Sequence, residues 1–515
     1  MSKITIKQEY ASQNTVANHR QIGVNWQGHL ATGIALLLAL PWLSNVNFGP
    51  SGSSVQWLIA WIIAAASTPL LLGKGISDQT RKKSLVLAWI IAAVLSAFMA
   101  LAQYLGQTSS LGGLVQSSEI GQAYANLRQR NQLATLLNMG LFSLLWLSTQ
   151  PGGSIKTTQI LMLSCAAVVG SACAATGSRT GLFQFLLLAI ATKVFGYRWR
   201  IMAVALLAYL TGAVLLPHFI GMDSFSSGIL SRAIDNSASC HSRLALWSNV
   251  LHLIAQKPWL GWGWGELDYA HFVTLYPDER FCEILDNAHN LPLHLAVELG
   301  APLAILACGA VGWLVWRAKP WADTHPTRQL AWVVLAVIGL HSLVEYPLWY
   351  GPFQVTVVLC VWMLYATPAQ PQKRKQNMAP SPIAIAWIAT ILIALCTFVA
   401  WDYWRVSQIY TAPERRNSAY RVNTLAKIQG SWLFKDQVRF AELATTELTQ
   451  FNAQHLSELA VGLLHFSPEP RVVQKLIEGA TLLGNDAQAA YYLQRFKAAY
   501  PKEYQLWNLK SGGRN

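Results

Sequence analysis

Residues 84–104 read SLVLAWIIAAVLSAFMALAQY, a run of 21 residues without a charged side chain. A helix rises about 1.5 Å per residue, so this run can cross the hydrocarbon layer of a bilayer, which is about 30 Å thick. Comparable runs recur over the first 400 residues, near 29–44, 55–72, 131–149, 158–176, 180–196, 200–220, 291–316, 329–345, 352–367 and 383–401. We therefore predict an all-α, polytopic membrane protein of about eleven transmembrane helices.

The composition agrees with a membrane protein. The chain has 515 residues, of which 53% are hydrophobic and 12% charged, whereas soluble globular domains are about one quarter charged. The net charge of +14 would suggest a nucleic-acid partner in a soluble protein. Here the basic residues occupy short loops between apolar runs, which is typical of a topology signal. We expect membrane lipid, and no nucleic acid, around this chain.

The basic loops predict the orientation. If residues 1–28 are cytoplasmic, the short cytoplasmic loops contain nearly all the Lys and Arg residues found in short loops. The short loops 45–54 and 346–352, on the opposite side, contain none, as the positive-inside rule predicts. Residues 1–28 also lack the apolar core of a cleavable signal peptide. With an odd number of spans, the long loop 221–289 and the C-terminal region lie outside the cytoplasm. We expect a multi-pass protein of the bacterial inner membrane with a periplasmic loop and tail.

The tail differs from the membrane domain, which we place at 29–401. Over 402–515 the apolar runs end and the pattern indicates amphipathic helices near 436–451, 455–465, 470–483 and 486–500. Their arrangement resembles tetratricopeptide helix pairs, which bind protein segments. Recognition of an acceptor protein is one interpretation of this periplasmic α-helical domain. A stabilising lid over the membrane domain is the other.

Two of the seven cysteines share the long loop. Cys240 and Cys282 would lie in an oxidising compartment under this topology, so we predict a disulfide between them. Two free thiols are the alternative. The remaining cysteines fall within predicted spans, where they are typical packing residues.

Two arginines on the external side are not required by the topology. Arg179 lies in the very short turn Gly177-Ser-Arg-Thr-Gly181, whose small residues leave room for a bulky anion. Arg243 opens an amphipathic stretch that runs to His252 and is expected to lie along the membrane surface. The alternative roles are contact with lipid headgroups for Arg179 and with anionic lipid for Arg243.

A histidine marks the boundary between the long loop and the next span. His289 is placed where a group could exchange protons while facing a lipid-borne substrate. Two further pairs, His294 with Glu298 and His341 with Glu345, are four residues apart, so each could pair within the bundle in a structural role.

Together these residues suggest a site for a lipid-linked diphosphate. Guanidinium groups match phosphate oxygens in bidentate geometry and remain charged, and a neutral histidine could accept a proton from a hydroxyl. No phosphate-binding loop of the type Gly-x-x-x-x-Gly-Lys-Ser/Thr occurs. The loop carboxylates are scattered, at Asp223, Asp235, Glu266, Asp268, Asp278, Glu279, Glu283 and Asp286. We therefore expect no nucleotide, no metal and no other cofactor.

The order of these motifs resembles that of a known superfamily. Gly177-Ser-Arg-Thr-Gly181, Ser242-Arg-x-x-x-Trp247, Pro258-x-x-Gly-x-Gly-x-Gly265 and His289-Asn290, followed by a helix with Glu298-x-Gly300, resemble the bacterial O-antigen ligases and polymerases. Residues 126–135 and 341–350 add to the likeness, which covers about 30–400. Within the superfamily the chain is most similar to the O-linked oligosaccharyltransferases that glycosylate type IV pilins.

The resemblance implies transfer of a preassembled oligosaccharide from undecaprenyl diphosphate to Ser or Thr of an exported, pilin-like protein, with inversion at the anomeric carbon. It places Arg179 and Arg243 on the diphosphate and makes His289 the base or the orienting group. Secondary candidates are Arg128, Gln132, Glu298, His341 and Glu345. Where the family usually has Gln-Pro-Asn, this chain has Gln129-Arg-Asn131, a departure that bears on acceptor or donor preference.

Two rival functions remain open at this point. The same chemistry with another acceptor gives an O-antigen ligase, which uses lipid A core, or an O-antigen polymerase. A transporter or flippase of lipid-linked sugar, without covalent chemistry, is the less favoured rival, since the two related halves common in transporters are not evident.

Overall fold

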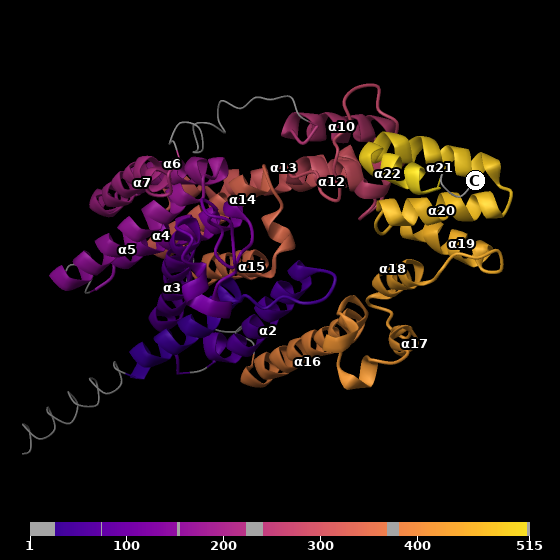
Figure 1. Cartoon of the computed structure of the whole chain (residues 1–515). Coiled ribbons are helices and arrows are strands. Elements are labelled where there is room, and N and C mark those ends of the chain that lie inside the picture. Colours follow the sequence, from indigo (N-terminus) through magenta and orange to yellow (C-terminus); the bar gives the residue numbers. More distant parts are fainter. Residues whose placement is uncertain (1–25, 74, 152–154, 223–239, 368–380, 512–515) are drawn as a thin grey trace, which may run out of the picture.

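The computed structural model describes residues 26–73, 75–151, 155–222, 240–367 and 381–511. Every regular element in these ranges is helical (Figure 1). The all-α prediction is therefore confirmed for the described part of the chain.

Helices of the structure overlap the predicted apolar runs. They are a helix over 26–43, α2 (Gly52–Leu72), α3 (Asp78–Tyr104), α4 (Arg130–Ser148), α5 (Lys156–Ala175), α6 (Arg179–Val194), α7 (Trp199–Phe219), α13 (Ala301–Ala318), α14 (Pro326–Ser342), α15 (Gly351–Ala366) and α16 (Pro382–Ser407). Six of the described helices, α2, α3, α5, α7, α13 and α16, are long and apolar enough to cross a membrane. The others are shorter or less apolar, so the count of eleven stays a prediction.

The core of the bundle forms around α4. This helix contacts α3, α5, α6 and α14, and Leu133, Leu137, Phe142 and Leu145 are fully buried along it. A helix that is apolar on all sides and covered on all sides is the expected centre of such a bundle. The N-terminal end of α4 is therefore held among several neighbouring helix ends, and the candidate site lies there.

The predicted span 291–316 is wrong as a single helix. The structure divides it into α12 (Leu291–Leu299) and α13, with the break at Gly300. Gly300 has a φ of +88°, and a Cβ added there would lie 2.1 Å from the carbonyl oxygen of Trp259. Only glycine fits this close approach. The apolar run hid the break because helix breaks of this kind depend on contacts with a distant segment.

The long loop contains helices of its own. After α10 (Arg243–Gln256) and α11 (Leu267–Val273), the chain enters α12, and these three elements share a small core that includes Leu246, Leu253 and Val297. The glycine and tryptophan segment 257–266 runs along the end of α12, where the Trp262 amide donates to the Val297 carbonyl at 2.9 Å. This segment thus packs α12 against α10.

The C-terminal helices are α17 (Thr424–Ile428), α18 (Lys435–Thr445), α19 (Ala453–Leu463), α20 (Pro470–Leu482), α21 (Asp486–Ala499) and α22 (Pro501–Ser511). Helix α18 ends earlier than the expected 451. The side chain of Asn452 accepts from the Thr449 amide and donates to the Glu447 carbonyl, and such side-chain bonds compete with helix continuation.

Helix α21 of the C-terminal region contacts α11 of the long loop, and the C-terminal helices α20–α22 lie near α10 and α12 in Figure 1. Phe272 of α11 is buried in the same core as Phe496 of α21. Arg495 donates to the Val273 carbonyl at 2.8 Å, and His465 contacts Glu266 at 2.6 Å. The C-terminal helices therefore stabilise the long loop, which contains Arg243 and His289.

Candidate active site at one end of the bundle

The carboxylate of Glu345 is the centre of the candidate site. It lies in the turn that follows α14, and its side chain is 5% exposed. His289 Nδ1 contacts Oε2 at 2.7 Å, Asn131 Nδ2 donates to Oε1 at 3.1 Å, and Arg243 Nη2 donates to Oε1. Segments from the start of α4, the start of α10 and the start of α12 thus meet at one side chain.

His289 is held in one orientation by its neighbours. Its backbone is left-handed, with φ +49°, and its amide donates to Asn287 Oδ1 at 2.9 Å. Asn290 caps α12 by accepting from the Leu293 amide and also donates to the Leu343 carbonyl at 2.9 Å. Tyr346 lies edge-on to the imidazole, with ring centroids 4.8 Å apart.

These contacts assign the two ring nitrogens of His289. An ionised carboxylate only accepts hydrogen bonds, so Nδ1 donates to Glu345. In the neutral imidazole, Nε2 is then the nitrogen with the free lone pair. The imidazole is therefore arranged as a base whose other nitrogen is fixed by a carboxylate, as in nucleophile-activating triads.

Arg243 is the first residue of α10. Ser242 caps this helix by accepting from the Ala245 amide at 3.1 Å, and the side chain of Arg243 is 39% exposed. One of its five N–H donors is directed to Glu345. The guanidinium therefore keeps donors for an anion on its exposed side.

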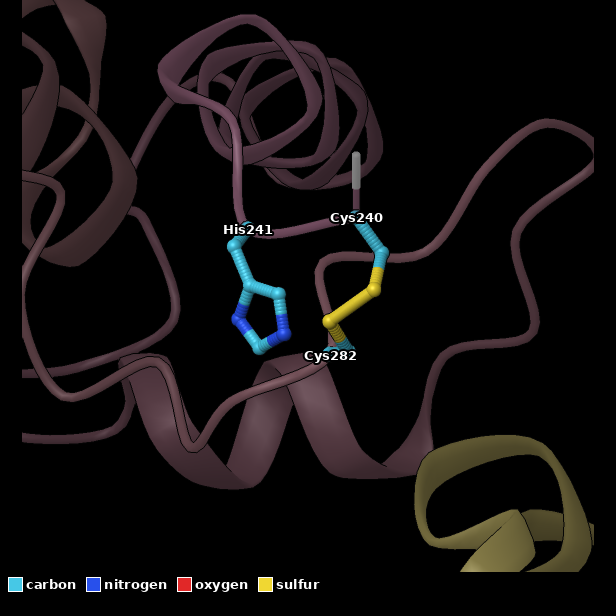
Figure 2. Close-up of side chains that lie close together, drawn as sticks. All are labelled: Cys240, His241 and Cys282. Carbon is cyan, nitrogen blue, oxygen red and sulfur yellow. A yellow bond between two sulfur atoms is a disulfide. The ribbon is translucent and has the colours of Figure 1, made fainter. Parts of the chain in front are cut away.

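The start of α10 is tied to the rest of the long loop by a disulfide. Cys240 and Cys282 are bonded, with Cα atoms 5.4 Å apart (Figure 2). One group in the described part of the chain has potential metal-ligand atoms within 4.8 Å of one another. It consists of Cys240, His241 and Cys282. Cysteine binds a metal as its thiolate, and both sulfurs are in the disulfide, so this group is not suited to a metal. His241 instead contacts Glu283 at 3.0 Å.

Arg179 is the first residue of α6 and its side chain is exposed. Ser178 caps the helix by accepting from the Gly181 amide at 2.9 Å, and its hydroxyl donates to Asn131 Oδ1 at 2.6 Å. Because Asn131 also donates to Glu345, the start of α6 is linked to the same centre. No contact of the Arg179 guanidinium with another described residue is evident, so it is available to an anion.

Two residues that connect the site were not predicted from the sequence. Asn131 and Ser178 lie within the quoted motifs. The sequence did not identify them as site residues because amides and hydroxyls at helix starts usually serve as caps. Asn131 also follows Arg130, whose guanidinium donates to Gln122. Arg130 occupies the position where the resemblance predicts proline, and a proline could not make this contact.

The secondary candidates have different surroundings. Arg128 is exposed, with a left-handed φ of +63°. Gln132 is fully buried, next to the Tyr350 hydroxyl. The predicted side-chain pairing of His341 with Glu345 is wrong, since His341 Nδ1 contacts Thr135 Oγ1 at 2.9 Å. Helix α14 ends at Ser342, and the carboxylate of Glu345 contacts His289, Arg243 and Asn131 instead.

His294 and Glu298 of α12 form a second buried pair, with Nε2 and Oε2 3.5 Å apart. Burial lowers the pKa of His294 to about 4. Burial raises the pKa of Glu298 to about 7. His294 is therefore neutral at pH 7. His294 and Glu345 line the same narrow space, which has no room for a water molecule.

Glu345 is ionised despite its burial. Burial alone would raise the pKa of this carboxyl, but the hydrogen bond from His289 and the positive charge of Arg243 outweigh it, and the pKa lies below its usual value. A buried carboxylate is stable in this position because its oxygens accept from charged and polar donors. The site thus contains a fixed negative charge that holds two cationic or protonatable groups.

Comparisons with known proteins support the resemblance that the sequence motifs predict. Three families match successive parts of the chain: one described as protein glycosylation ligase at 123–147, one as O-antigen ligase at 163–308, and one as the C-terminal part of a virulence factor membrane-bound polymerase at 329–511. These matches include all the segments that meet at Glu345. The class is that of membrane proteins similar to O-antigen ligases and polymerases.

Two curated proteins of Acinetobacter baylyi give the more particular likeness. The chain is 26% identical to a general O-oligosaccharyltransferase over 396 residues, which are 72% of this chain and 68% of that protein. It is also 26% identical to a ComP-specific O-oligosaccharyltransferase over 251 residues, 47% of this chain and 44% of that protein. The resemblance to the O-linked oligosaccharyltransferases that the motifs predicted is confirmed.

Proposed function

We propose that this protein transfers a preassembled oligosaccharide from undecaprenyl diphosphate to a Ser or Thr hydroxyl of an exported protein such as a type IV pilin. The similarity to two O-oligosaccharyltransferases supports glycosyl transfer to protein. The observation that carries the proposal is the convergence of Arg243 and His289 on the buried carboxylate of Glu345.

In this proposal the two arginines bind the diphosphate. Arg179 and Arg243 begin α6 and α10, and both side chains have exposed donors. Negative charge builds on the diphosphate as the bond from the anomeric carbon to its oxygen breaks. Guanidinium groups stabilise that charge, and the helix starts add to the positive potential. This electrostatic role requires neither a metal nor a nucleotide.

His289 serves as the base. Its Nε2 accepts the proton of the Ser or Thr hydroxyl while the hydroxyl oxygen forms the new bond to the anomeric carbon. The diphosphate leaves with the electron pair of the broken bond, and attack from the opposite face inverts the anomeric configuration. Glu345 stabilises the imidazolium that forms and holds the ring in place.

The proposed location follows from the distribution of charge. The site residues occupy one end of the bundle, whereas Lys156, Lys193 and Arg198 lie at the opposite ends of their helices. By the positive-inside rule, the basic end is cytoplasmic and the site is periplasmic, in the inner membrane. We place the catalytic membrane domain at 29–401 and a periplasmic helical domain at 402–515. Its docking on the long loop fits both a lid and an acceptor-binding role.

The second candidate is the same transfer to a glycan acceptor. The O-antigen ligase family matches 163–308 and the polymerase family matches 329–511, so an O-antigen ligase that uses lipid A core, or a polymerase, is the alternative. The chemistry at Glu345 would be the same in each case.

A reconstituted assay separates these candidates. The purified protein in liposomes would receive undecaprenyl-diphosphate-linked oligosaccharide with either a folded pilin or lipid A core as acceptor. A glycan-sized mass gain on the pilin supports the proposal. A gain on lipid A core alone, with the pilin unchanged, would show that the acceptor is wrong. Intact donor with both acceptors would show that the protein does not catalyse this transfer.

A further inference from the structure

An open polar cleft lies in the loop before α4. Its walls are Ser117, Ser118, Glu119, Gln122 and Tyr124, and we name these residues the loop cleft. Its volume of about 510 Å³ falls within the range of roughly 300–1,000 Å³ that is common for small-molecule sites. Its walls provide hydroxyls, an amide, a carboxylate and an aromatic ring, which are the groups that bind sugar hydroxyls and sugar faces.

The loop that forms the cleft is held rigidly from below. The buried amide of Gln103 donates to the carbonyls of Gln116 and Ala125 and accepts from the amides of Tyr124 and Ala125, at 2.6–3.0 Å. Asn126 accepts from the Gln116 amide at 3.0 Å. A loop fixed by two buried side chains presents its outer residues in one arrangement, which reduces the entropic cost of binding.

The loop cleft is next to the proposed active site. Gln122 in its wall accepts from Arg130, the first residue of α4. The following residue, Asn131, donates to Glu345. On its other side the loop approaches the end of α7, because a Cβ added to Gly121 would lie 3.2 Å from Ile220. The cleft therefore opens at the same end of the bundle as His289 and Arg243.

Polar atoms in and beside the cleft still lack partners. Among the described residues, the hydroxyl of Ser118 and the amide oxygen of Gln116 are shielded from solvent and make no hydrogen bond. Buried polar groups without partners are uncommon in native proteins and call for an explanation. Ser118 is part of the cleft wall, so a ligand with many hydroxyl groups would lie beside its unpaired hydroxyl.

We propose that the loop cleft binds sugar units of the lipid-linked donor beyond the one attached to the diphosphate. This inference rests on the function proposed above and names an oligosaccharide as the ligand. The ring of Tyr124 lies against one sugar face, and Glu119 and Gln122 accept from sugar hydroxyls. The diphosphate stays at the arginines, so the cleft selects the glycan and takes no part in bond breaking.

The test compares two donors with the same enzyme in liposomes. One is undecaprenyl diphosphate with a single sugar, and the other carries a tetrasaccharide with the same first sugar. The variants are Glu119→Gln, an exposed and nearly isosteric change, and Tyr124→Leu. The control is Glu447→Gln, an exposed glutamate in the turn after α18. Donor KM and kcat are measured with a pilin acceptor.

We expect each cleft variant to raise the KM for the tetrasaccharide donor by about tenfold, while its kinetics with the single-sugar donor match those of the wild type. The unchanged single-sugar kinetics also show that the variant is folded. Equal losses with both donors in both variants, or wild-type kinetics with the tetrasaccharide, would overturn the inference. If the wild type transfers neither glycan, the proposed function fails instead.

Discussion

Replacing Glu345 with glutamine removes one negative charge from the centre of the site and leaves its shape almost unchanged. The carboxylate accepts from His289, Arg243 and Asn131. A glutamine amide has one accepting oxygen and one donating nitrogen, so at least one of these donors would face another donor. The expected result is an imidazole and a guanidinium that no longer hold their positions.

The size of the effect follows from the two charge-assisted contacts. A hydrogen bond to a charged group contributes about 1.5–3 kcal/mol, so losing the contacts to His289 and Arg243 would cost roughly 3–6 kcal/mol if both act in the transition state. At about 1.36 kcal/mol per factor of ten, kcat should fall by roughly a hundredfold to ten-thousandfold.

The assay is turnover of purified protein with donor and pilin, measured for Glu345→Gln and for the control Glu283→Gln. Glu283 also contacts a histidine, His241, at 3.0 Å, but both side chains are exposed. The control should therefore keep nearly full activity. Apparent Tm is measured in parallel, so that kcat is compared at a temperature at which both variants are folded.

The pH dependence of stability gives a second readout for Glu345. Its pKa in the folded protein lies below the ordinary 4.5, so its contribution to stability is fully present above pH 4.5 and is lost as the pH falls through the lowered pKa. The Tm difference between wild type and Glu345→Gln should shrink in that acidic range. A kcat within threefold of wild type would refute the assigned positioning role.

Three further predictions concern the groups around this centre. Arg243→Lys and Arg179→Lys should each raise the donor KM roughly tenfold in steady-state assays, since lysine cannot bind phosphate in a bidentate manner. Replacing Cys240 and Cys282 by serine removes the disulfide that closes a loop with a sequence separation of 42. This change should lower the free energy of unfolding by up to about 4 kcal/mol. The variant should have a lower apparent Tm than the wild type, and adding reductant should not change that Tm. Burial raises the pKa of Asp268 to about 8. The native state therefore binds more protons than the unfolded state between about pH 4 and 8, and it loses stability as the pH rises. The variant Asp268→Asn should make the decline in Tm from pH 6 to pH 8 smaller.

Hydropathy was sufficient to locate the long apolar helices because apolar length is a local property. Each predicted run overlaps a helix, but the run 291–316 contains the break at Gly300. That break depends on the carbonyl of Trp259, which local hydropathy does not describe.

The identities of the charged site residues could also be predicted, whereas their meeting point could not. Arg243 and His289 are separated by a loop whose path the sequence leaves open, and the structure brings them together at Glu345. Glu345 was paired with His341 on the basis of helical spacing. That rule holds within a helix, and α14 ends at Ser342 before Glu345 is reached.

The loop cleft gave no signal in the sequence. Serine, glutamine and tyrosine in a loop are ordinary, and only the support from Gln103 and Asn126 reveals a preformed surface. Contacts across such distances along the chain are not visible in local patterns.

The most direct test of the central claim is intact mass spectrometry of pilins from cells that make the undecaprenyl-linked glycan. Three strains are compared, with the wild-type protein, with His289→Ala and without the protein. The account predicts a glycan-sized mass gain on pilin in the first strain alone. Protein glycosylation would be contradicted if pilin stayed unmodified in all three strains while lipopolysaccharide gained or lengthened its glycan in the wild-type strain. The role of His289 as the base would be contradicted if pilin were modified in the His289→Ala strain.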